Sequence, residues 1–199
     1  MTFGTAIVDP PWAYRKLRAN ATGGYGKSSG YATDVYDTLT VDELAELPVR
    51  DIVSNVLLLW TTGPHMPAAL QLVNAWGFQY ITLAYWHKTT KAGVLDTLSG
   101  ERVYRPHMGV GYWFRGDTEP IVVAKKPGTP SYRTGERATF VSAVRGHSAK
   151  PDTLHHLAEK HFPGPYLELF ARRHYPGWTC LGNELDEGKD IRDAMKDLA

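Results

Sequence analysis

The sequence predicts an α/β protein with a mostly parallel sheet and helices on both faces, and three observations support this fold class. Apolar runs alternate with helical patterns along the chain. The apolar runs are continuous rather than alternating, which is typical of strands buried on both faces. The chain has 199 residues, of which 43% are hydrophobic and 22% charged, as expected for a compact globular domain. We therefore expect a single domain spanning residues 1–199.

The first half of the chain contains clear start and stop signals. The strand at residues 3–8 has to end at Pro10 and Pro11, because proline donates no hydrogen bond to a ladder. A capping box at residues 40–43 predicts a short helix that reaches Leu47. A buried strand at residues 55–61 precedes an amphipathic helix at residues 64–76.

The second half predicts further strands and two helices. Pro151 favours a helix start, and that helix is expected to run to about His161. A polar helix is expected from about Lys189. The expected strands cover residues 78–86, 112–114, 121–124, 166–170 and 178–181.

The net charge is only +1, but the basic residues are segregated. Residues 13–33 contain four basic residues and no acidic one, and residues 125–150 contain six basic residues and one acidic one. Such segments can contact phosphates, although they are also compatible with ordinary solvated loops. We interpret residues 13–35 and 125–150 as target-recognition loops. The first group is expected to contact phosphate through Arg15, Lys16, Arg18 and Lys27.

The chemistry of cysteine and histidine excludes several classes of site. Cys180 is the only cysteine, so neither an intrachain disulfide nor a cysteine-rich zinc site can form, and we expect it to be a buried strand residue. His155, His156 and His161 share a predicted helix without a carboxylate or cysteine partner set, so we expect solvent-facing histidines and no metal. No signal peptide or membrane-length apolar run is visible, which predicts a cytoplasmic protein.

Asp9-Pro10-Pro11-Trp12 follows the first predicted strand. Open α/β sheets bind ligands at the carboxyl ends of their strands. The exocyclic amine of adenine is a poor nucleophile, because its lone pair is conjugated with the ring. A carboxylate and a proline carbonyl could accept its two N–H bonds and direct that lone pair at an electrophilic methyl group. An adjacent aromatic ring could stack on the base, although the same tetrapeptide could also be a simple turn.

A second group of polar residues follows two neighbouring predicted strands near the C-terminus. The first strand leads into Arg172-Arg173-His174, and the second leads into Gly182-Asn183-Glu184. Polar side chains at adjacent strand ends could bind the ribose and carboxylate of a nucleoside cofactor, or could be ordinary surface charges.

Together these motifs resemble the adenine-N6 methyltransferase family that includes the eukaryotic mRNA adenosine methyltransferase catalytic subunit and many phage and bacterial proteins. The resemblance extends over nearly the whole chain. Its segments are Asp9-Pro10-Pro11-Trp12, Tyr36-Asp37-Thr38-Leu39, Leu59-Trp60-Thr61 with His65, Trp86-His87-Lys88, residues 109–115, Thr118-Glu119-Pro120, residues 147–151 and residues 168–184.

The resemblance implies a Rossmann-like fold that uses S-adenosyl-L-methionine (SAM), with the catalytic motif placed before the cofactor segment. It implies that Asp9 and the Pro10 carbonyl bind the target amine and that Pro11 and Trp12 shape the base pocket. Tyr36 is expected to contact the substrate. Apart from the resemblance, Glu119 and Arg145 could position loops or substrate, and salt-bridge roles fit them equally well. The implied cofactor residues are Lys150, Arg172, His174, Asn183, Glu184, Asp190 and Ile191.

The resemblance leaves the polymer substrate open. The chain lacks the long N-terminal extension and zinc fingers of the mRNA enzymes, which favours DNA over RNA. A non-catalytic partner subunit is the third possibility, but such subunits typically lose the tetrapeptide that this chain retains. We expect no membrane partner and either a monomer or a homodimer, in the host cytoplasm if the protein is encoded by a phage.

Overall fold

The computed structural model describes residues 1–12, 38–96, 102–109, 113–145, 149–185, 190–196 and 198, with the backbone alone for strand residues 91–96 and 102–105. The strands are β1 (Phe3–Val8), β2 (Val53–Trp60), β3 (Gln79–Asp96), β4 (Arg102–Pro106), β5 (Thr118–Lys125), β6 (Thr139–Ala143), β7 (Tyr166–Leu169) and β8 (Trp178–Leu181). The helices are α1 (Val41–Ala45), α2 (Val49–Ile52), α3 (Met66–Ala75), α4 (Thr153–His161) and α5 (Ile191–Lys196), with a 3-10 turn, η2 (Gly63–His65). None of these helices is long and apolar enough to cross a membrane.

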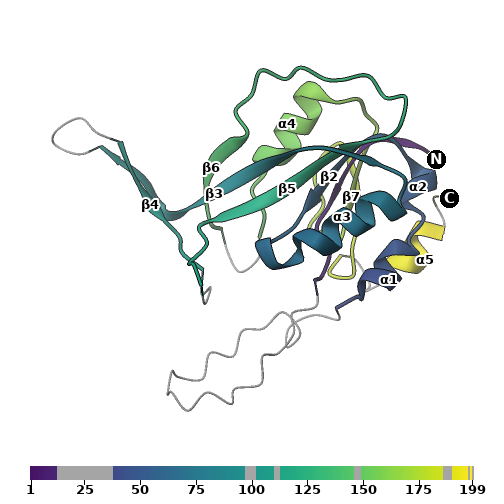
Figure 1. Cartoon of the computed structure of the whole chain (residues 1–199), viewed down its shortest axis with the longest axis horizontal. Helices are drawn as coiled ribbons and strands as arrows, with labels where there is room; N and C mark the ends of the chain where they lie inside the picture. Colours follow the sequence, from purple (N-terminus) through teal and green to yellow (C-terminus); the bar gives the residue numbers. More distant parts are fainter. Residues whose placement is uncertain are drawn as a thin grey trace, which may run out of the picture.

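The strands form one sheet in the order β4-β3-β5-β2-β1-β7-β8, with β6 paired to β3 (Figure 1). Strand β1 pairs in parallel with β2 and β7, and β8 pairs in parallel with β7. Strand β5 runs antiparallel between β2 and β3. The outer half of β3 forms an antiparallel hairpin with β4 that projects from the body of the molecule (Figure 1). The sheet is therefore mixed: six of its eight strands run in one direction, and β4 and β5 run in the opposite direction.

Helices cover both faces of the sheet and create two hydrophobic clusters. One cluster packs α1, α2, α3 and α5 against the sheet, and the other packs α4 against the opposite face (Figure 1). Within β2, Leu57 and Leu59 belong to the first cluster, whereas Val56 and Leu58 belong to the second. Successive side chains of a strand point to opposite faces, so a strand between two helical layers has to be apolar throughout.

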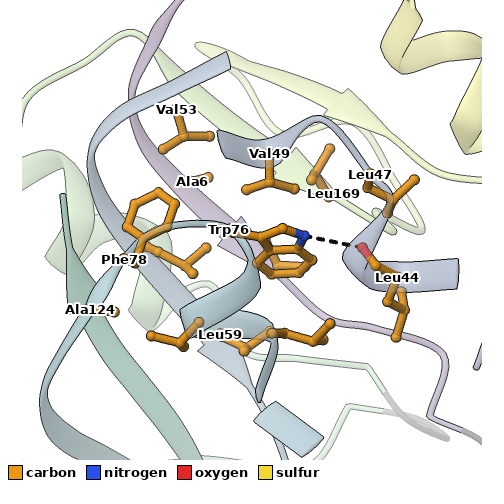
Figure 2. Close-up of a cluster of buried hydrophobic side chains, with 14 of the residues drawn as sticks. Ala6, Leu44, Leu47, Val49, Val53, Leu59, Trp76, Phe78, Ala124 and Leu169 are labelled. Atoms are coloured by element: carbon orange, nitrogen blue, oxygen red, sulfur yellow. Dashed lines mark hydrogen bonds between the residues drawn. The ribbon is translucent and has the colours of Figure 1, made fainter. Parts of the chain in front are cut away.

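Trp76 anchors the first cluster at the end of α3. Its ring is 1% exposed, and its indole N–H donates to the Leu44 carbonyl of α1 at 3.1 Å (Figure 2). Helix α1 begins at the predicted capping box, in which the Thr40 hydroxyl accepts from the Glu43 N–H and the Glu43 carboxylate accepts from the Thr40 N–H. The Trp76–Leu44 hydrogen bond thus attaches α1 to the end of α3.

The strand register brings the carboxyl ends of four strands together. Val8 pairs with Leu59 of β2 and Leu169 of β7, and Leu169 pairs with Leu181 of β8. We call this side of the sheet the Asp9 edge, because Asp9 directly follows Val8. Glu119, at the start of β5, pairs with Trp86 and lies near the same edge.

Three expectations need correction or refinement. Trp113 and Phe114 lie in an exposed turn and not in a strand at residues 112–114; residue 112 lies outside the described part. His155 is buried, not solvent-facing, because it pairs with Glu168 of β7 at 2.9 Å and stacks on Tyr175. His156 is exposed as expected, while His161 is partly buried and contacts Glu136 at 2.9 Å.

The basic segment at residues 125–150 begins far from the Asp9 edge. Lys125 pairs with Val56, near the opposite end of β2, and residues 126–138 return across the α4 face to β6. The segment approaches the Asp9 edge again through β6, which pairs with β3 at Trp86, and through Lys150, which contacts Asp9. The other proposed recognition loop, residues 13–35, lies outside the described residues.

Candidate functional site

Asp9 occupies the first position after β1, where the two prolines end the ladder. Its backbone N–H still donates to the Leu169 carbonyl at 3.3 Å, which fixes the residue against β7. The Pro10 carbonyl accepts one backbone hydrogen bond, from Trp12 N–H at 2.8 Å. A carbonyl oxygen has two lone pairs, so it retains capacity to accept a second donor.

Trp12 is held rigidly beside this turn. It is 6% exposed, its indole N–H donates to the Trp60 carbonyl at 3.3 Å, and its ring stacks on His65 at a centroid distance of 5.3 Å. Trp12 therefore packs against the core and against His65 of η2, and these contacts cover most of its ring.

A chain of four alternating charges connects Asp9 with β3. Lys150 Nζ lies 2.8 Å from Asp9 Oδ2 and 3.4 Å from Glu119 Oε2, and Lys88 Nζ lies 2.5 Å from Glu119 Oε1. All four side chains are at most 20% exposed. We call Asp9, Lys150, Glu119 and Lys88 the charge chain. Its two carboxylates and two ammonium groups balance, as buried ions require.

Two tryptophans lie beside the charge chain. Lys150 Nζ is 5.4 Å from the ring centroid of Trp60, and Lys88 Nζ is 5.4 Å from that of Trp86. The two rings also contact each other edge to face at 6.1 Å. Each ammonium group is thus placed within cation–π distance of a tryptophan ring.

Burial and pairing act on the protonation of this cluster in opposite directions. Burial raises the pKa of Asp9 above its usual value, while Lys150 opposes that shift and Glu119 adds to it. Burial alone would lower the pKa of Lys150, but the Asp9 and Glu119 carboxylates raise it above its usual value. Burial also acts to raise the pKa of Glu119, yet Lys150 and Lys88 together hold it below its usual value.

A cavity of about 480 Å³ opens beside Asp9 and Pro11. Its volume lies within the range of roughly 300–1,000 Å³ that is common for small-molecule sites. The cavity is bounded by the ends of β1, β7 and β8 and by the start of α1. Its other lining residues are Thr38, Leu39, Glu43, Phe170, Ala171, Arg172, Asn183, Glu184, Asp190 and Arg192.

Two backbone features shape the floor of this cavity. Phe170, the first residue after β7, has a φ of 64°, a left-handed conformation that non-glycine residues rarely adopt. Gly182, the first residue after β8, has no room for a side chain, because a Cβ there would overlap the Ala171 carbonyl oxygen. The ends of β7 and β8 therefore approach more closely than two side chains would permit.

Four of the seven expected cofactor residues line the cavity: Arg172, Asn183, Glu184 and Asp190. Arg172 and Glu184 form an ion pair at 3.5 Å across the two strand ends. Asn183 Oδ1 accepts from the Ile191 N–H at 3.1 Å, so Asn183 also fixes the start of α5. Asp190 accepts from the backbone and guanidinium of Arg192, which lowers its pKa to about 2.

The remaining expected site residues are distributed differently. The Ile191 side chain is buried in the first cluster, His174 is exposed, and Lys150 belongs to the charge chain. Arg145 pairs with Asp152 at 2.7 Å. Tyr36, Arg15, Lys16, Arg18 and Lys27 lie outside the described residues. The sequence did not predict a role for Lys88. The one feature that pointed to this residue was its place in the motif Trp86-His87-Lys88.

The cavity fits a nucleoside cofactor. Carboxylates at Glu43, Glu184 and Asp190 can accept from hydroxyl or amino groups, and Arg172 can pair with an anion. Phe170, Leu39 and Pro11 provide apolar walls. Within the described residues, no cluster of histidine, cysteine and carboxylate side chains could hold a metal ion. The sheet with this cavity at its carboxyl edge has the arrangement of a Rossmann-like fold that binds a nucleoside cofactor.

Comparisons with known proteins agree with this class. The MT-A70 family model matches residues 3–184. A type II methyltransferase, M.MunI, from Mycoplasma sp is 31% identical over 197 residues, which cover 92% of this chain and 77% of that protein. The human N(6)-adenosine-methyltransferase catalytic subunit METTL3 is 29% identical over 92% of this chain, and the MT-A70-like enzyme of Arabidopsis thaliana is 28% identical over 98%. The chain spans only 28% and 25% of those two longer proteins.

The chain therefore belongs to the MT-A70 family of SAM-dependent N6-adenine methyltransferases. This result confirms the family, the fold class and the cofactor expected from the sequence.

Proposed function

We propose that this protein transfers a methyl group from SAM to the exocyclic N6 amine of adenine in DNA. One observation carries the proposal: Asp9 lines the same cavity as Arg172, Asn183 and Glu184. A carboxylate suited to an amine and a set of groups suited to a nucleoside cofactor thus share one space.

Asp9 and the Pro10 carbonyl are the proposed acceptors for the two N–H bonds of the amine. They are adjacent in the chain and fixed by the prolines and by the Asp9–Leu169 and Trp12–Pro10 backbone hydrogen bonds. Such fixed acceptors orient the nitrogen lone pair before reaction, which lowers the barrier through positioning and electrostatics.

Lys150 and burial together suit Asp9 to two consecutive tasks. Lys150 keeps the carboxylate ionised, so that it can accept a hydrogen bond from the amine. When the new N–C bond forms, the nitrogen becomes positively charged and must lose a proton. Burial makes Asp9 more basic than an exposed aspartate, so it is a suitable acceptor for that proton.

The cofactor supplies an electrophilic methyl group on a sulfonium when it is bound. We assign its ribose and neighbouring polar groups to Asn183, Glu184 and Asp190, and its carboxylate end to Arg172 and Lys150. Lys150, His174 and Ile191 do not line the cavity, so their part in cofactor binding is proposed from the resemblance alone.

The choice of DNA rests on similarity. The type II methyltransferase is 31% identical to this chain, and the two adenosine methyltransferases named above are 29% and 28% identical. RNA adenosine is the second candidate, because the relatives named N(6)-adenosine-methyltransferases match 92% or more of this chain. We further propose that Arg15, Lys16, Arg18 and Lys27 contact phosphates; replacing all four by alanine is expected to weaken DNA binding without changing site preference.

Methylation of matched duplex DNA, single-stranded DNA and RNA tests the proposal. Products are digested to nucleosides, and N6-methyladenine is quantified by mass spectrometry. Asp9→Asn retains the side-chain shape but removes the negative charge, so activity should fall about 100-fold or more. Asp51→Asn, at an exposed position of α2, serves as the matched control. Product on RNA alone would refute the choice of DNA, and full activity of Asp9→Asn would refute the role of Asp9.

A further inference from the structure

Two adjacent aromatic residues near the Asp9 edge are almost fully exposed. Trp113 is 94% exposed and Phe114 is 89% exposed, and Met108 on the same turn is 57% exposed. These are three of the eight large hydrophobic residues that are exposed in the described part of the chain. The other five tryptophans are at most 8% exposed, so the exposure of Trp113 is exceptional for this protein. Contiguous exposed apolar side chains are typical of interaction sites.

The turn that bears these side chains is tied to the body of the protein. Gly109 N–H donates to the Gly116 carbonyl at 2.8 Å, and Lys88 N–H donates to the Asp117 carbonyl at 2.7 Å. His87 Nε2 lies 3.5 Å from Asp117 Oδ2. The aromatic pair is therefore presented on a turn with several fixed attachments.

The turn also connects directly to the proposed catalytic centre. Glu119 follows Trp113 by six residues, and a chain of that length spans at most about 22 Å. Glu119 contacts Lys150, which contacts Asp9. Successive base pairs are about 3.4 Å apart, so a span of about 22 Å corresponds to roughly six base pairs, and a duplex whose adenine lies at Asp9 is long enough to reach this turn.

We propose that Trp113 and Phe114 stack on bases of the DNA that flank the target adenine, while Arg115 pairs with a phosphate. This inference rests on the proposed DNA substrate. An enzyme that acts on the amine of a paired base has to extrude that base, which breaks its stacking. Aromatic side chains replace such stacking without regard to base identity. Arg115 is exposed beside them and supplies a positive charge.

Intrinsic fluorescence gives a direct test, because Trp113 is the one tryptophan that a solute such as acrylamide can reach easily. Binding of a DNA oligonucleotide should reduce acrylamide quenching, and Trp113→Phe should remove the quenchable signal. Trp113→Ala and Phe114→Ala should each weaken DNA binding ~5-fold or more, as loss of one stacked base does. SAM affinity should stay unchanged. Tyr80→Ala serves as the control, since Tyr80 is an exposed aromatic residue at the start of β3.

The salt dependence of binding separates the two kinds of contact. Arg115→Ala should reduce the slope of log affinity against log salt by about 0.9, while Trp113→Ala should leave the slope unchanged. Unchanged quenching with DNA, or unchanged affinity of both alanine variants, would overturn the inference even if the wild-type protein methylates DNA. Conversely, protection of Trp113 by DNA without methyl transfer would refute the proposed function and leave this surface supported. If quenching of Trp113 by acrylamide falls as the protein concentration rises in the absence of DNA, Trp113 and Phe114 form a contact between copies of the protein. That result would also overturn the inference.

Discussion

Replacing Lys150 by methionine should shift the pH dependence of catalysis in a direction that the charge chain dictates. Methionine retains most of the side-chain volume but removes the ammonium group that lies 2.8 Å from Asp9 and 3.4 Å from Glu119. The variant leaves two buried carboxylates with Lys88 as their single ammonium partner in the charge chain. Both burial and Glu119 already raise the pKa of Asp9, so loss of the opposing Lys150 raises it further.

The size of the effect follows from the separation of the charges. At an effective dielectric constant of about 20, charges 2.8 Å apart attract each other by ~6 kcal/mol before their lost hydration is counted. Breaking a buried pair by removing one partner typically costs about 3–5 kcal/mol. We therefore expect Lys150→Met to destabilise the protein by about this amount at neutral pH, and less at acid pH, where Asp9 becomes protonated.

The assay is kcat/KM for methyl transfer between about pH 5 and pH 9, together with urea unfolding. Only the ionised Asp9 can accept from the amine, so activity falls on the acid side as Asp9 binds a proton. The acid limb of the Lys150→Met profile should lie at higher pH than that of the wild-type protein. Lys150→Arg retains the charge, so the acid limb of its profile should lie close to that of the wild-type protein. An acid limb that stays in place or moves to lower pH would refute the electrostatic role of Lys150.

Three further predictions follow from the same geometry. Glu119→Gln removes a carboxylate that raises the pKa of Asp9, so the acid limb should move to lower pH, opposite to Lys150→Met; a shift in the same direction in both variants would contradict the charge chain. Gly182→Ala should destabilise the protein by about 1–3 kcal/mol in thermal unfolding and weaken SAM binding in calorimetry, because the new Cβ would overlap the backbone of Ala171; an unchanged melting temperature would show that the two strand ends can separate. Asp190 has its pKa lowered to about 2 by Arg192, so its stabilisation is present above about pH 4 and is lost as the pH falls toward 2. Since the Asp190 side chain is 36% exposed, solvent screens the pair, and the loss should stay below about 1 kcal/mol in urea unfolding and be absent in Asp190→Asn.

Several features of the site could be predicted from sequence because their causes are local. Pro10 and Pro11 end β1 for lack of an N–H donor, which places Asp9 at a strand end in any fold that contains this strand. The capping box at Thr40 and Glu43 specifies the start of α1 through contacts three residues apart. The continuous apolar runs indicated a sheet covered on both faces, and the two clusters confirm it.

Histidine and aromatic exposure could not be predicted, because it depends on which elements pack together. His155 is buried since α4 lies against β7, which brings Glu168 within 2.9 Å of its ring. Trp113 and Phe114 belong to an aromatic run that is typical of a strand, yet they form an exposed turn. Their hydropathy alone does not reveal whether a neighbouring layer covers them.

The sequence by itself determined the family motif and indicated the residues that we propose for the chemistry, namely Asp9, Pro10 and the polar residues after β7 and β8. Tertiary structure decided how they cooperate. Lys150 is 141 residues from Asp9 in the chain, and their 2.8 Å contact exists because the path from β5 through β6 returns to the Asp9 edge. Hydrogen bonds and charges act over a few ångströms, whereas sequence patterns report neighbours along the chain, so a charge chain assembled from β1, β3, β5 and the segment before α4 becomes visible only in the folded protein.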